Sequence, residues 1–353
     1  MQRMPNAKPC ACAAALLAAW PAATFALDEQ RPEVQSFIQQ MAERHGFAPG
    51  ELVEVFARVE ARPSIVEAMA RPAEKTRPWH EYRTLFLTER RVARGAETAR
   101  QQSAALQQAA RRGVPPQYLL AITGVETFYG EIIGRHRVID ALATLAFDFP
   151  RRGEFFRSEL EQFLLMSREE TIDPLAPVGS YAGAMGIPQF MPSSFRTWAV
   201  DGDGNGHRDL WGSWHDVFAS VANYLASHGW RAGEPVMARA DVTGADLAGL
   251  QFGKLDLSET VGSLRARGVR FDAQLPASAP AVLIQLAGAD GPEFRVGFTN
   301  FYAITRYNRS QLYASAVNDL AEALAATWQP RVEMPSTDQP PQAKPFTSVS
   351  SAE

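Results

Sequence analysis

The chain has 353 residues, of which 46% are hydrophobic and 21% are charged, a composition typical of a soluble globular protein. Because domains usually contain roughly 100–200 residues, this length indicates about two packed units. The net charge of −4 at pH 7 gives nucleic-acid binding no support, since proteins that bind phosphate backbones usually carry a basic face.

Residues 1–26 have the composition of a secretory signal peptide. Two basic residues precede an alanine-rich apolar run at 11–20, and small residues at 24 and 26 suit a signal peptidase. The run is shorter than the ~20 residues that span a bilayer, and a plain hydrophobic helix is the alternative. Cys10 and Cys12 precede the run, so neither is placed for lipidation. We therefore expect a periplasmic protein that is not a lipoprotein and, once the signal is removed, has no transmembrane segment or disulfide.

Helices dominate the next part of the sequence. Apolar residues recur every three or four positions over residues 31–70, and residues 85–112 are rich in Arg, Glu, Gln and Ala, which predicts a largely solvated helix. Pro115 and Pro116 suit the first turn of a mostly buried helix that ends near Glu126. Further apolar stripes predict a helix around 156–164 and another over 213–229.

The pattern changes after Trp230. Residues 281–284 and 294–298 predict strands separated by a Gly-Ala-Asp-Gly turn, and hence a small β-containing unit. A final helix is predicted with Ser310 as its N-cap. The apolar stripe of that helix is Leu312, Val317, Leu320 and Leu324. From Gln329 onward the chain is rich in Pro, Ser, Thr and Gln, which predicts disorder.

Glu126 stands in the most informative stretch, residues 124–130 (GVETFYG). A carboxyl group at the end of an apolar helix can keep its proton near neutral pH, because burial disfavours the charged form. A general acid for a glycosidic oxygen needs this property. On this stretch alone, a glutamate that simply leaves the core at a helix end is the better explanation.

Three further motifs reverse that interpretation: residues 140–145 (DALATL), 147–152 (FDFPRR) and 179–195 (GSYAGAMGIPQFMPSSF). Together with the Glu126 segment, they resemble the lytic murein transglycosylase B family in their order and spacing. The resemblance runs from about Trp79 to Trp230 and resumes at residues 300–308 (NFYAITRYN). The Ile-Pro pair at 187–188 departs from the family pattern, in which a glycine-containing pair is common.

The resemblance implies a fold and a reaction. The fold class is α+β, mainly α: a lysozyme-like helical catalytic core with an additional helical domain and a small β-containing domain. The reaction cleaves the β-1,4 bond between MurNAc and GlcNAc in peptidoglycan without water. Glu126 matches the single catalytic carboxylate, which protonates the glycosidic oxygen and then deprotonates the C6 hydroxyl that closes a 1,6-anhydro ring. Asp140 and Asp148 are the acids of the matching motifs that follow Glu126, and neither is required as a second catalytic group.

The resemblance also implies a substrate cleft of aromatic, hydroxyl, amide and arginine side chains. The matching residues are Tyr82, Arg151, Arg152, Ser180, Gln189, Asn223, Tyr224, Tyr302 and Tyr307. The arginine pair suits a peptide or lactyl carboxylate, because a guanidinium group binds both carboxylate oxygens. Tyr224 is alternatively a core residue, and the two arginines are alternatively solvated surface. Met185 and Phe190 are expected in the core.

Residues 201–209 (DGDGNGHRD) resemble the start of an EF-hand loop. Position twelve of that loop is Gly212 rather than glutamate, and the family resemblance implies that a later aspartate closes the site. The predicted metal ligands are Asp201, Asp203, Asn205, His207 through its carbonyl, and Asp216. A structural Ca2+ is therefore expected, and no organic cofactor. The alternatives are a plain turn and, for Asp216, capping of the helix that follows Ser213.

These predictions divide the chain into six segments. They are a signal peptide (1–26), an N-terminal helical region (27–110), the lysozyme-like core with its EF-hand-like loop (111–232), the small β-containing unit (233–300), a C-terminal cleft segment and helix (301–328), and a disordered tail (329–353). The expected partner is the peptidoglycan glycan strand, and no protein partner is identified. A muramidase, which leaves a reducing end, and a non-catalytic peptidoglycan-binding scaffold are the alternative functions.

Overall fold

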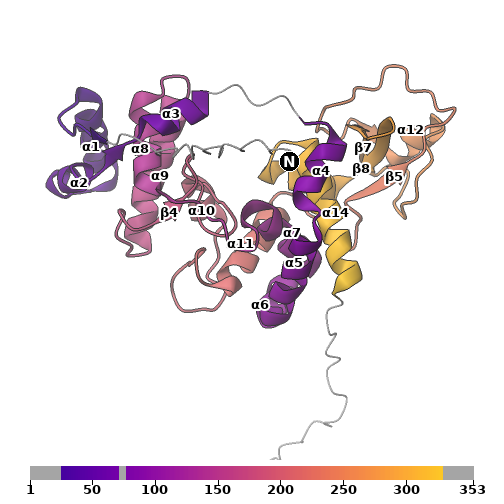
Figure 1. The fold of residues 1–353 in the computed structure, drawn as a ribbon, viewed down its shortest axis with the longest axis horizontal. Helices are drawn as coiled ribbons and strands as arrows, with labels where there is room; N and C mark the ends of the chain where they lie inside the picture. The colour runs from indigo at the N-terminus through magenta and orange to yellow at the C-terminus, as the bar shows by residue number, and fades with distance from the viewer. Residues whose placement is uncertain (1–24, 71–76, 329–353) are drawn as a thin grey trace, which may run out of the picture. The chain divides into compact units, whose positions relative to one another are not determined.

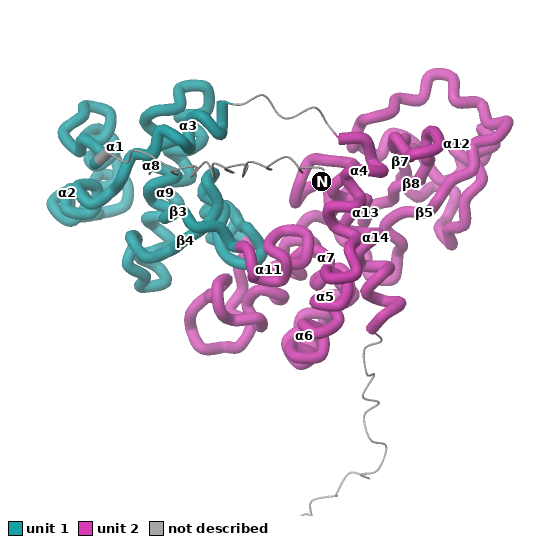
Figure 2. Tube along the Cα trace, in the orientation of Figure 1, with its two compact units in different colours: residues 1–76, 133–197 teal, residues 77–132, 198–353 magenta. Residues whose placement is uncertain are grey.

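The structure, a computed structural model, describes residues 25–70 and 77–328 and divides into two compact units (Figure 2). Unit 1 comprises residues 1–76 and 133–197, and unit 2 comprises residues 77–132 and 198–353. Each unit is therefore built from two separate stretches of chain. The predicted tail lies outside the described residues, as does the predicted signal peptide apart from Phe25–Ala26.

Unit 1 is helical, with two short antiparallel ribbons. Its helices are α1 (Pro32–His45), α2 (Pro49–Phe56), α3 (Pro63–Ala70), α8 (Val138–Asp148), α9 (Gly153–Glu169) and, at its boundary, α10 (Pro192–Trp198). Strand β1 (Phe25–Ala26) pairs with β2 (Glu60–Ala61), and β3 (His136–Arg137) pairs with β4 (Val178–Gly179). Helix α8 is buried along most of its length and packs against α9, while the rings of Phe37, Phe56 and Phe147 meet edge to face.

Unit 2 gathers its helices around α7 (Pro116–Thr127), as Figure 1 shows. Helix α7 is buried on nearly all sides, which agrees with its apolar sequence. It contacts α5 (Glu89–Gln101), α6 (Ser103–Ala110), α11 (Trp214–Ser227) and α14 (Gln311–Thr327). Helices α4 (Trp79–Phe86) and α13 (Thr299–Tyr307) pack against α14. Within the described ranges, no helix is both long and apolar enough to cross a membrane.

The stretch 85–112 differs from the single solvated helix that its composition predicts. It contains two helices, α5 and α6, which are separated at Gln102, and α5 buries Gly95, Ala96 and Ala99. Small side chains let neighbouring helices approach closely, and this face of α5 contacts α7 and α14. Most of the stretch is exposed or partly exposed, as its composition predicts, but the prediction of one continuous helix was wrong.

Unit 2 also contains a four-stranded antiparallel sheet in the order β5-β8-β7-β6. Its strands are β5 (Met237–Ala240), β6 (Glu259–Thr260), β7 (Pro280–Ala287) and β8 (Pro292–Gly297). The predicted Gly-Ala-Asp-Gly turn joins β7 to β8. With α12 (Val261–Ala266), the sheet has its own hydrophobic core, which includes Leu283, Val296 and Phe298. The predicted class, α+β and mainly α, is confirmed.

A buried ion-pair network ties this sheet to α14. Asp319 of α14 accepts hydrogen bonds from Arg295 of β8 at 2.5 and 3.0 Å and from Arg83 of α4 at 2.9 Å. Burial raises the pKa of Asp319, but the two guanidinium groups lower it by more, so the net direction is downward. Loss of Asp319 would leave Arg295, which is 4% exposed, with the more distant Glu293 at 3.9 Å as its remaining ion-pair partner. Breaking such a pair costs about 3–5 kcal/mol.

Candidate active site

Glu126 lies in the last turn of α7, a helix whose limits follow from its sequence. Pro115 is the N-cap and Pro116 is the first helical residue, where a missing N–H costs little. The helix ends at Phe128, whose φ of 53° lies in the left-handed region. Glu126 is partly exposed although its neighbours in the second half of α7 are buried, so its carboxyl group stands where the core meets solvent.

A hydrogen bond from Tyr313 of α14 holds the Glu126 side chain. The Tyr313 hydroxyl donates to Glu126 Oε1 at 2.5 Å. Burial raises the pKa of Glu126 to about 7, because desolvation disfavours the carboxylate more than the Tyr313 hydrogen bond favours it. A carboxyl group with this pKa can donate a proton and take one back near neutral pH.

Two predicted cleft tyrosines lie within electrostatic reach of Glu126. Burial first, and then the negative charge of Glu126, raises the pKa of Tyr82 and raises that of Tyr307 well above its usual value. The same two causes raise the pKa of Tyr313. All three phenols are therefore neutral near pH 7, and each can donate a hydrogen bond to a carboxylate or a sugar oxygen.

Tyr224 packs among other rings of unit 2. Its ring centroid lies 4.9 Å from that of Tyr307, 4.8 Å from that of Trp198 and 4.1 Å from that of His228. Its hydroxyl donates to the Arg306 carbonyl at 2.7 Å, and the residue is 8% exposed. These contacts give Tyr224 a packing role, and its contact with sugar stays a prediction.

Asn223 and Tyr302 have partners within unit 2 as well. Asn223 Nδ2 donates to the Trp198 carbonyl at 2.9 Å. The guanidinium carbon of Arg306 lies 4.1 Å from the centroid of the half-buried Tyr302 ring. Both side chains are partly exposed, and their contacts with substrate stay predictions.

Ser180 and Gln189 belong to unit 1 and stand in one tightly bonded loop. The Ala184 N–H donates to Ser180 Oγ at 3.0 Å, which orients the hydroxyl and leaves its proton available to donate. Gln189 has a φ of 53°, and its Nε2 donates to the carbonyls of Ile133 at 3.2 Å and Gly186 at 2.9 Å. Both side chains are partly exposed, so each is held in place without being enclosed.

Arg151 and Arg152 directly precede α9 and are exposed. The Arg152 guanidinium carbon lies 4.3 Å from the centroid of the Phe155 ring. Exposure agrees with either predicted role, carboxylate binding or solvated surface. In contrast, Met185 and Phe190 are 0% and 2% exposed, which confirms that both are core residues.

Asp140 and Asp148, the acids of the motifs that follow Glu126, take part in ion pairs of unit 1. Asp140 is 0% exposed and accepts hydrogen bonds from Arg137 at 2.8 Å and from Arg62 at 3.2 Å. Asp148 accepts one from Arg31 at 2.7 Å. Both carboxylates therefore serve the packing of unit 1.

Tyr313 is the residue that sequence reasoning missed. The stripe predicted for the last helix was aligned on Leu312, whereas α14 buries Tyr313 together with Val317 and Leu320. Steps of four and three residues between these positions are themselves a helical stripe, so the periodicity contained the signal. Ser310 caps α14 as predicted, because its hydroxyl accepts the Tyr313 N–H at 3.3 Å.

The acidic loop brings three carboxylates together. Ligand oxygens of Asp201, Asp203 and Asp216 lie within 4.8 Å of one another. Two oxygens that bind the same Ca2+ at about 2.4 Å are at most about 5 Å apart, so this spacing fits one ion. Asn205 and His207 lie in the exposed part of the loop, where Asn205 Oδ1 accepts the His207 N–H at 2.8 Å. Their roles as ligands stay predictions.

Backbone N–H groups already orient these carboxylates. The Gly206 N–H donates to Asp201 Oδ2 at 2.8 Å, and this bond is the largest cause of the lowered pKa of Asp201. The Gly202 N–H donates to Asp216 Oδ1 at 2.8 Å. Ser213 caps α11 by accepting the Asp216 N–H at 3.3 Å. Helix capping thus accounts for Ser213, whereas the Asp216 carboxylate, which is 0% exposed, reaches into the loop.

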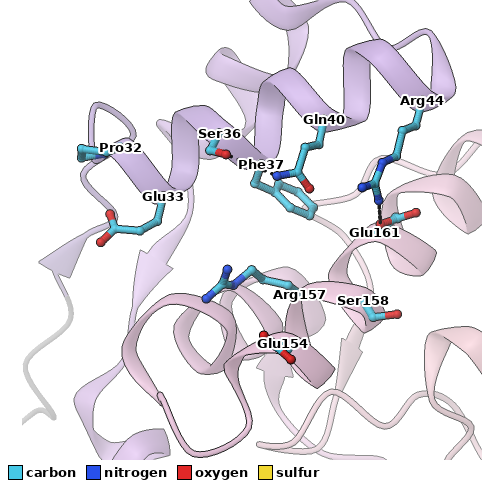
Figure 3. A pocket seen from close by; sticks show the side chains of 10 residues that line it. All are labelled: Pro32, Glu33, Ser36, Phe37, Gln40, Arg44, Glu154, Arg157, Ser158 and Glu161. Carbon is cyan, nitrogen blue, oxygen red and sulfur yellow. Dashed lines mark hydrogen bonds and ion pairs between the residues drawn. The ribbon is translucent and has the colours of Figure 1, made fainter.

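Unit 1 also has a groove of about 850 Å³ between α1 and α9 (Figure 3). Glu161 lies 4.0 Å from Arg44 and 2.8 Å from His45, and Arg157 and Glu154 add one charge of each sign. None of the predicted catalytic, substrate or metal residues lines this groove. Its mixed charges favour no single class of ligand.

Similarity to known proteins decides the family. The family model described as the transglycosylase SLT domain matches residues 29–322. The chain belongs to this family. The membrane-bound lytic murein transglycosylase B of Escherichia coli (strain K12) is 40% identical over 304 residues, which cover 83% of each chain. The predicted resemblance and the predicted enzyme class, a lytic transglycosylase, are thereby confirmed.

Solved structures of the family share the fold. The lytic transglycosylase SltB1 from Pseudomonas aeruginosa is 44% identical, with 84% of this chain and 98% of that chain covered and a TM-score of 0.80. Slt35 of Escherichia coli, solved in complex with calcium, is 40% identical, with 85% and 95% covered and a TM-score of 0.77. SltB3 from P. aeruginosa, solved with NAG-anhNAM-pentapeptide, is 34% identical, with 82% and 78% covered and a TM-score of 0.73.

Proposed function

We propose that this lytic transglycosylase cleaves the MurNAc-β-1,4-GlcNAc bond of peptidoglycan and leaves a 1,6-anhydro-MurNAc end. The observation that carries the proposal is Glu126, a partly buried carboxyl group with a raised pKa and a tyrosine donor. The complex of the related SltB3 with NAG-anhNAM-pentapeptide supports an anhydro product.

Glu126 acts first as an acid and then as a base. Its proton passes to the glycosidic oxygen while the bond between that oxygen and C1 of MurNAc breaks. The carboxylate then takes the proton of the C6 hydroxyl, whose oxygen forms the new bond to C1. Because the nucleophile lies within the substrate, no water is consumed, and one carboxylate suffices where most glycosidases need two.

Tyr313 assists this cycle without exchanging a proton. By donating to Glu126 Oε1, it stabilises the carboxylate that the first step creates and leaves Oε2 for the substrate. Burial raises the pKa of Tyr313 well above its usual value, so the phenol stays a donor at neutral pH.

The predicted cleft residues are assigned to glycan binding by their chemistry. In unit 2, Tyr82, Tyr224, Tyr302, Tyr307 and Asn223 offer flat rings and an amide to sugar faces and edges. In unit 1, Ser180 and Gln189 offer a hydroxyl and an amide, and Arg151 and Arg152 offer guanidinium groups to a peptide or lactyl carboxylate.

The acidic loop is assigned a structural Ca2+, which the hard oxygens of Asp201, Asp203 and Asp216 fit. The side chain of Asn205 and the carbonyl of His207 would add ligands. The ion would offset the clustered negative charge and hold the start of α11. The calcium complex of the related Slt35 supports this assignment.

A periplasmic location follows from the substrate and from the predicted signal peptide. Peptidoglycan lies outside the inner membrane, so an enzyme that cuts it must be exported. The expected macromolecular partner is the glycan strand itself.

Mass spectrometry of fragments released from isolated sacculi tests the proposed reaction. We expect muropeptides that end in 1,6-anhydro-MurNAc, and we expect Glu126→Gln to lower their rate of release by at least about 10³-fold while keeping the wild-type melting temperature. Reducing-end fragments would instead identify a muramidase. Release of no fragments by protein that pellets with sacculi would favour the binding scaffold.

A further inference from the structure

The phenol ring of Tyr129 occupies a slot between two glycines close to the catalytic acid. Tyr129 is 2% exposed and follows Glu126 by three positions. A Cβ atom on Gly95 of α5 would lie 2.3 Å from Tyr129 Oη, and one on Gly124 of α7 would lie 2.7 Å from the same atom. Cβ atoms do not approach other atoms this closely. Only glycine at both positions leaves room for the ring, and we call this space the glycine slot.

The backbone that leads into the glycine slot adopts an unusual conformation. Phe128 and Tyr129 have φ angles of 53° and 58°, in the left-handed region that non-glycine residues rarely adopt. Two such residues in succession persist only when surrounding contacts hold them. Their N–H groups donate to the carbonyls of Gly124 at 3.2 Å and Thr123 at 3.1 Å, which closes the turn of α7 that carries Glu126.

Ring packing holds both left-handed residues. The guanidinium carbons of Arg90 and Arg91 each lie 4.9 Å from the centroid of the Phe128 ring. Tyr129 is held by shape, because its hydroxyl is buried and has no hydrogen-bond partner in the described part of the chain. The conformation of the turn therefore depends on how the two rings fit.

We propose that Tyr129 is a positioning residue: its ring, locked in the glycine slot, sets the end of α7 so that Glu126 stays half-buried against Tyr313. The inference rests on the catalytic role proposed for Glu126. A Cβ atom on Gly95 would also lie 2.5 Å from Leu324 Cδ2 of α14, the helix that supplies Tyr313. The slot thus lies where α5, α7 and α14 meet, and a shift of the ring displaces the acid relative to its donor.

Gly95→Ala tests the slot from a helix that does not carry the acid. Because alanine favours a helix more than glycine does, a loss of activity must come from the clash of the new Cβ with Tyr129 and Leu324 rather than from a weaker helix. On soluble uncrosslinked glycan strands, we expect kcat to fall at least about tenfold and KM to change less than about twofold. The upper limb of the pH–rate profile should move to lower pH, because water that reaches Glu126 reduces its desolvation, and desolvation affects the pKa of Glu126 more than the Tyr313 hydrogen bond does. Gly50→Ala on α2 is the control, because open space surrounds Gly50.

Tyr129→Leu empties the slot without a clash, and it decides the question if Gly95→Ala does not fold. It should lower kcat and move the pH limb in the same direction, whereas Tyr129→Phe, which keeps the ring, should keep kcat within about twofold. Combining Tyr129→Phe with Gly95→Ala should restore part of kcat, because it removes the atom nearest the new Cβ.

A folded Tyr129→Leu protein with wild-type kcat and pH limb would overturn the positioning role. Equal losses in Tyr129→Phe and Tyr129→Leu would also overturn it, because the ring would then not be the element that matters. Wild-type turnover in Glu126→Gln is a different outcome, since it would refute the proposed catalytic acid itself.

Discussion

Two parts of unit 2 use carboxyl groups in opposite ways. In the acidic loop, backbone N–H groups surround Asp201 and lower its pKa, with Gly206 as the largest contributor. At the end of α7, Glu126 is desolvated and receives a hydrogen bond from one phenol, and its pKa rises to about 7. The balance between donors and desolvation, rather than the type of acid, decides whether a carboxyl group suits a cation or carries a proton.

Of the changes considered for these two carboxyl sites, raising the pH should have the largest effect, and it should act on the rate of cleavage through Glu126. Glu126 must begin the reaction protonated, and its protonated fraction falls about tenfold for each unit above its pKa of about 7. The rate of anhydro-product release two units above that pKa should therefore be about 100-fold below its maximum. Melting temperatures in the same buffers serve as the control. A flat profile in a folded protein would contradict a protonated Glu126.

Tyr313→Phe should have a smaller effect on the rate and should shift the pH–rate profile in one direction. The hydrogen bond from Tyr313 lowers the pKa of Glu126, so its loss should move the upper limb to higher pH. It should also reduce kcat about 10- to 100-fold, because hydrogen bonds to charged groups contribute about 1.5–3 kcal/mol. Tyr118→Phe is the matched control, since Tyr118 joins the same two helices through Asn318 at 3.1 Å. Equal pH profiles for the two variants would contradict the role of Tyr313.

Asp216→Asn should abolish a Ca2+-dependent rise of a few degrees in the melting temperature. Ca2+ at about one hundred times its Kd stabilises a folded protein by about 2.7 kcal/mol, and differential scanning calorimetry after chelation and Ca2+ addition would measure the gain. The variant should lose this gain because Asp216 belongs to the carboxylate cluster. Asp209→Asn is the control, since Asp209 lies in the same loop outside that cluster. A wild-type melting temperature that does not change when Ca2+ is added would refute the metal site.

Local features of this fold were predictable because each depends on a few neighbouring residues. Ser213 and Ser310 cap α11 and α14 as their sequences indicate, and the Gly-Ala-Asp-Gly turn joins two strands. The break at Gln102 was not predictable in the same way, because it depends on how α5 and α6 pack against other helices.

The same distinction applies to the site. Glu126 was found from a local motif and the family resemblance, but its pKa depends on burial and on Tyr313, which lies 187 residues further along the chain. The glycine slot brings Gly95, Gly124 and Tyr129 together in space, and their spacing in the sequence does not predict this contact. Interactions between distant segments are the part of the site that sequence patterns describe least.

The distance along the chain between Glu126 and Tyr313 also sets an order of events during synthesis. The ribosome makes the acid long before it makes α14, so a nascent or truncated copy carries Glu126 without its donor and leaves α7 uncovered on the α14 side. An enzyme that cuts the wall of its own cell is then competent only after α14 has been made and docked. Incomplete copies are expected to be harmless.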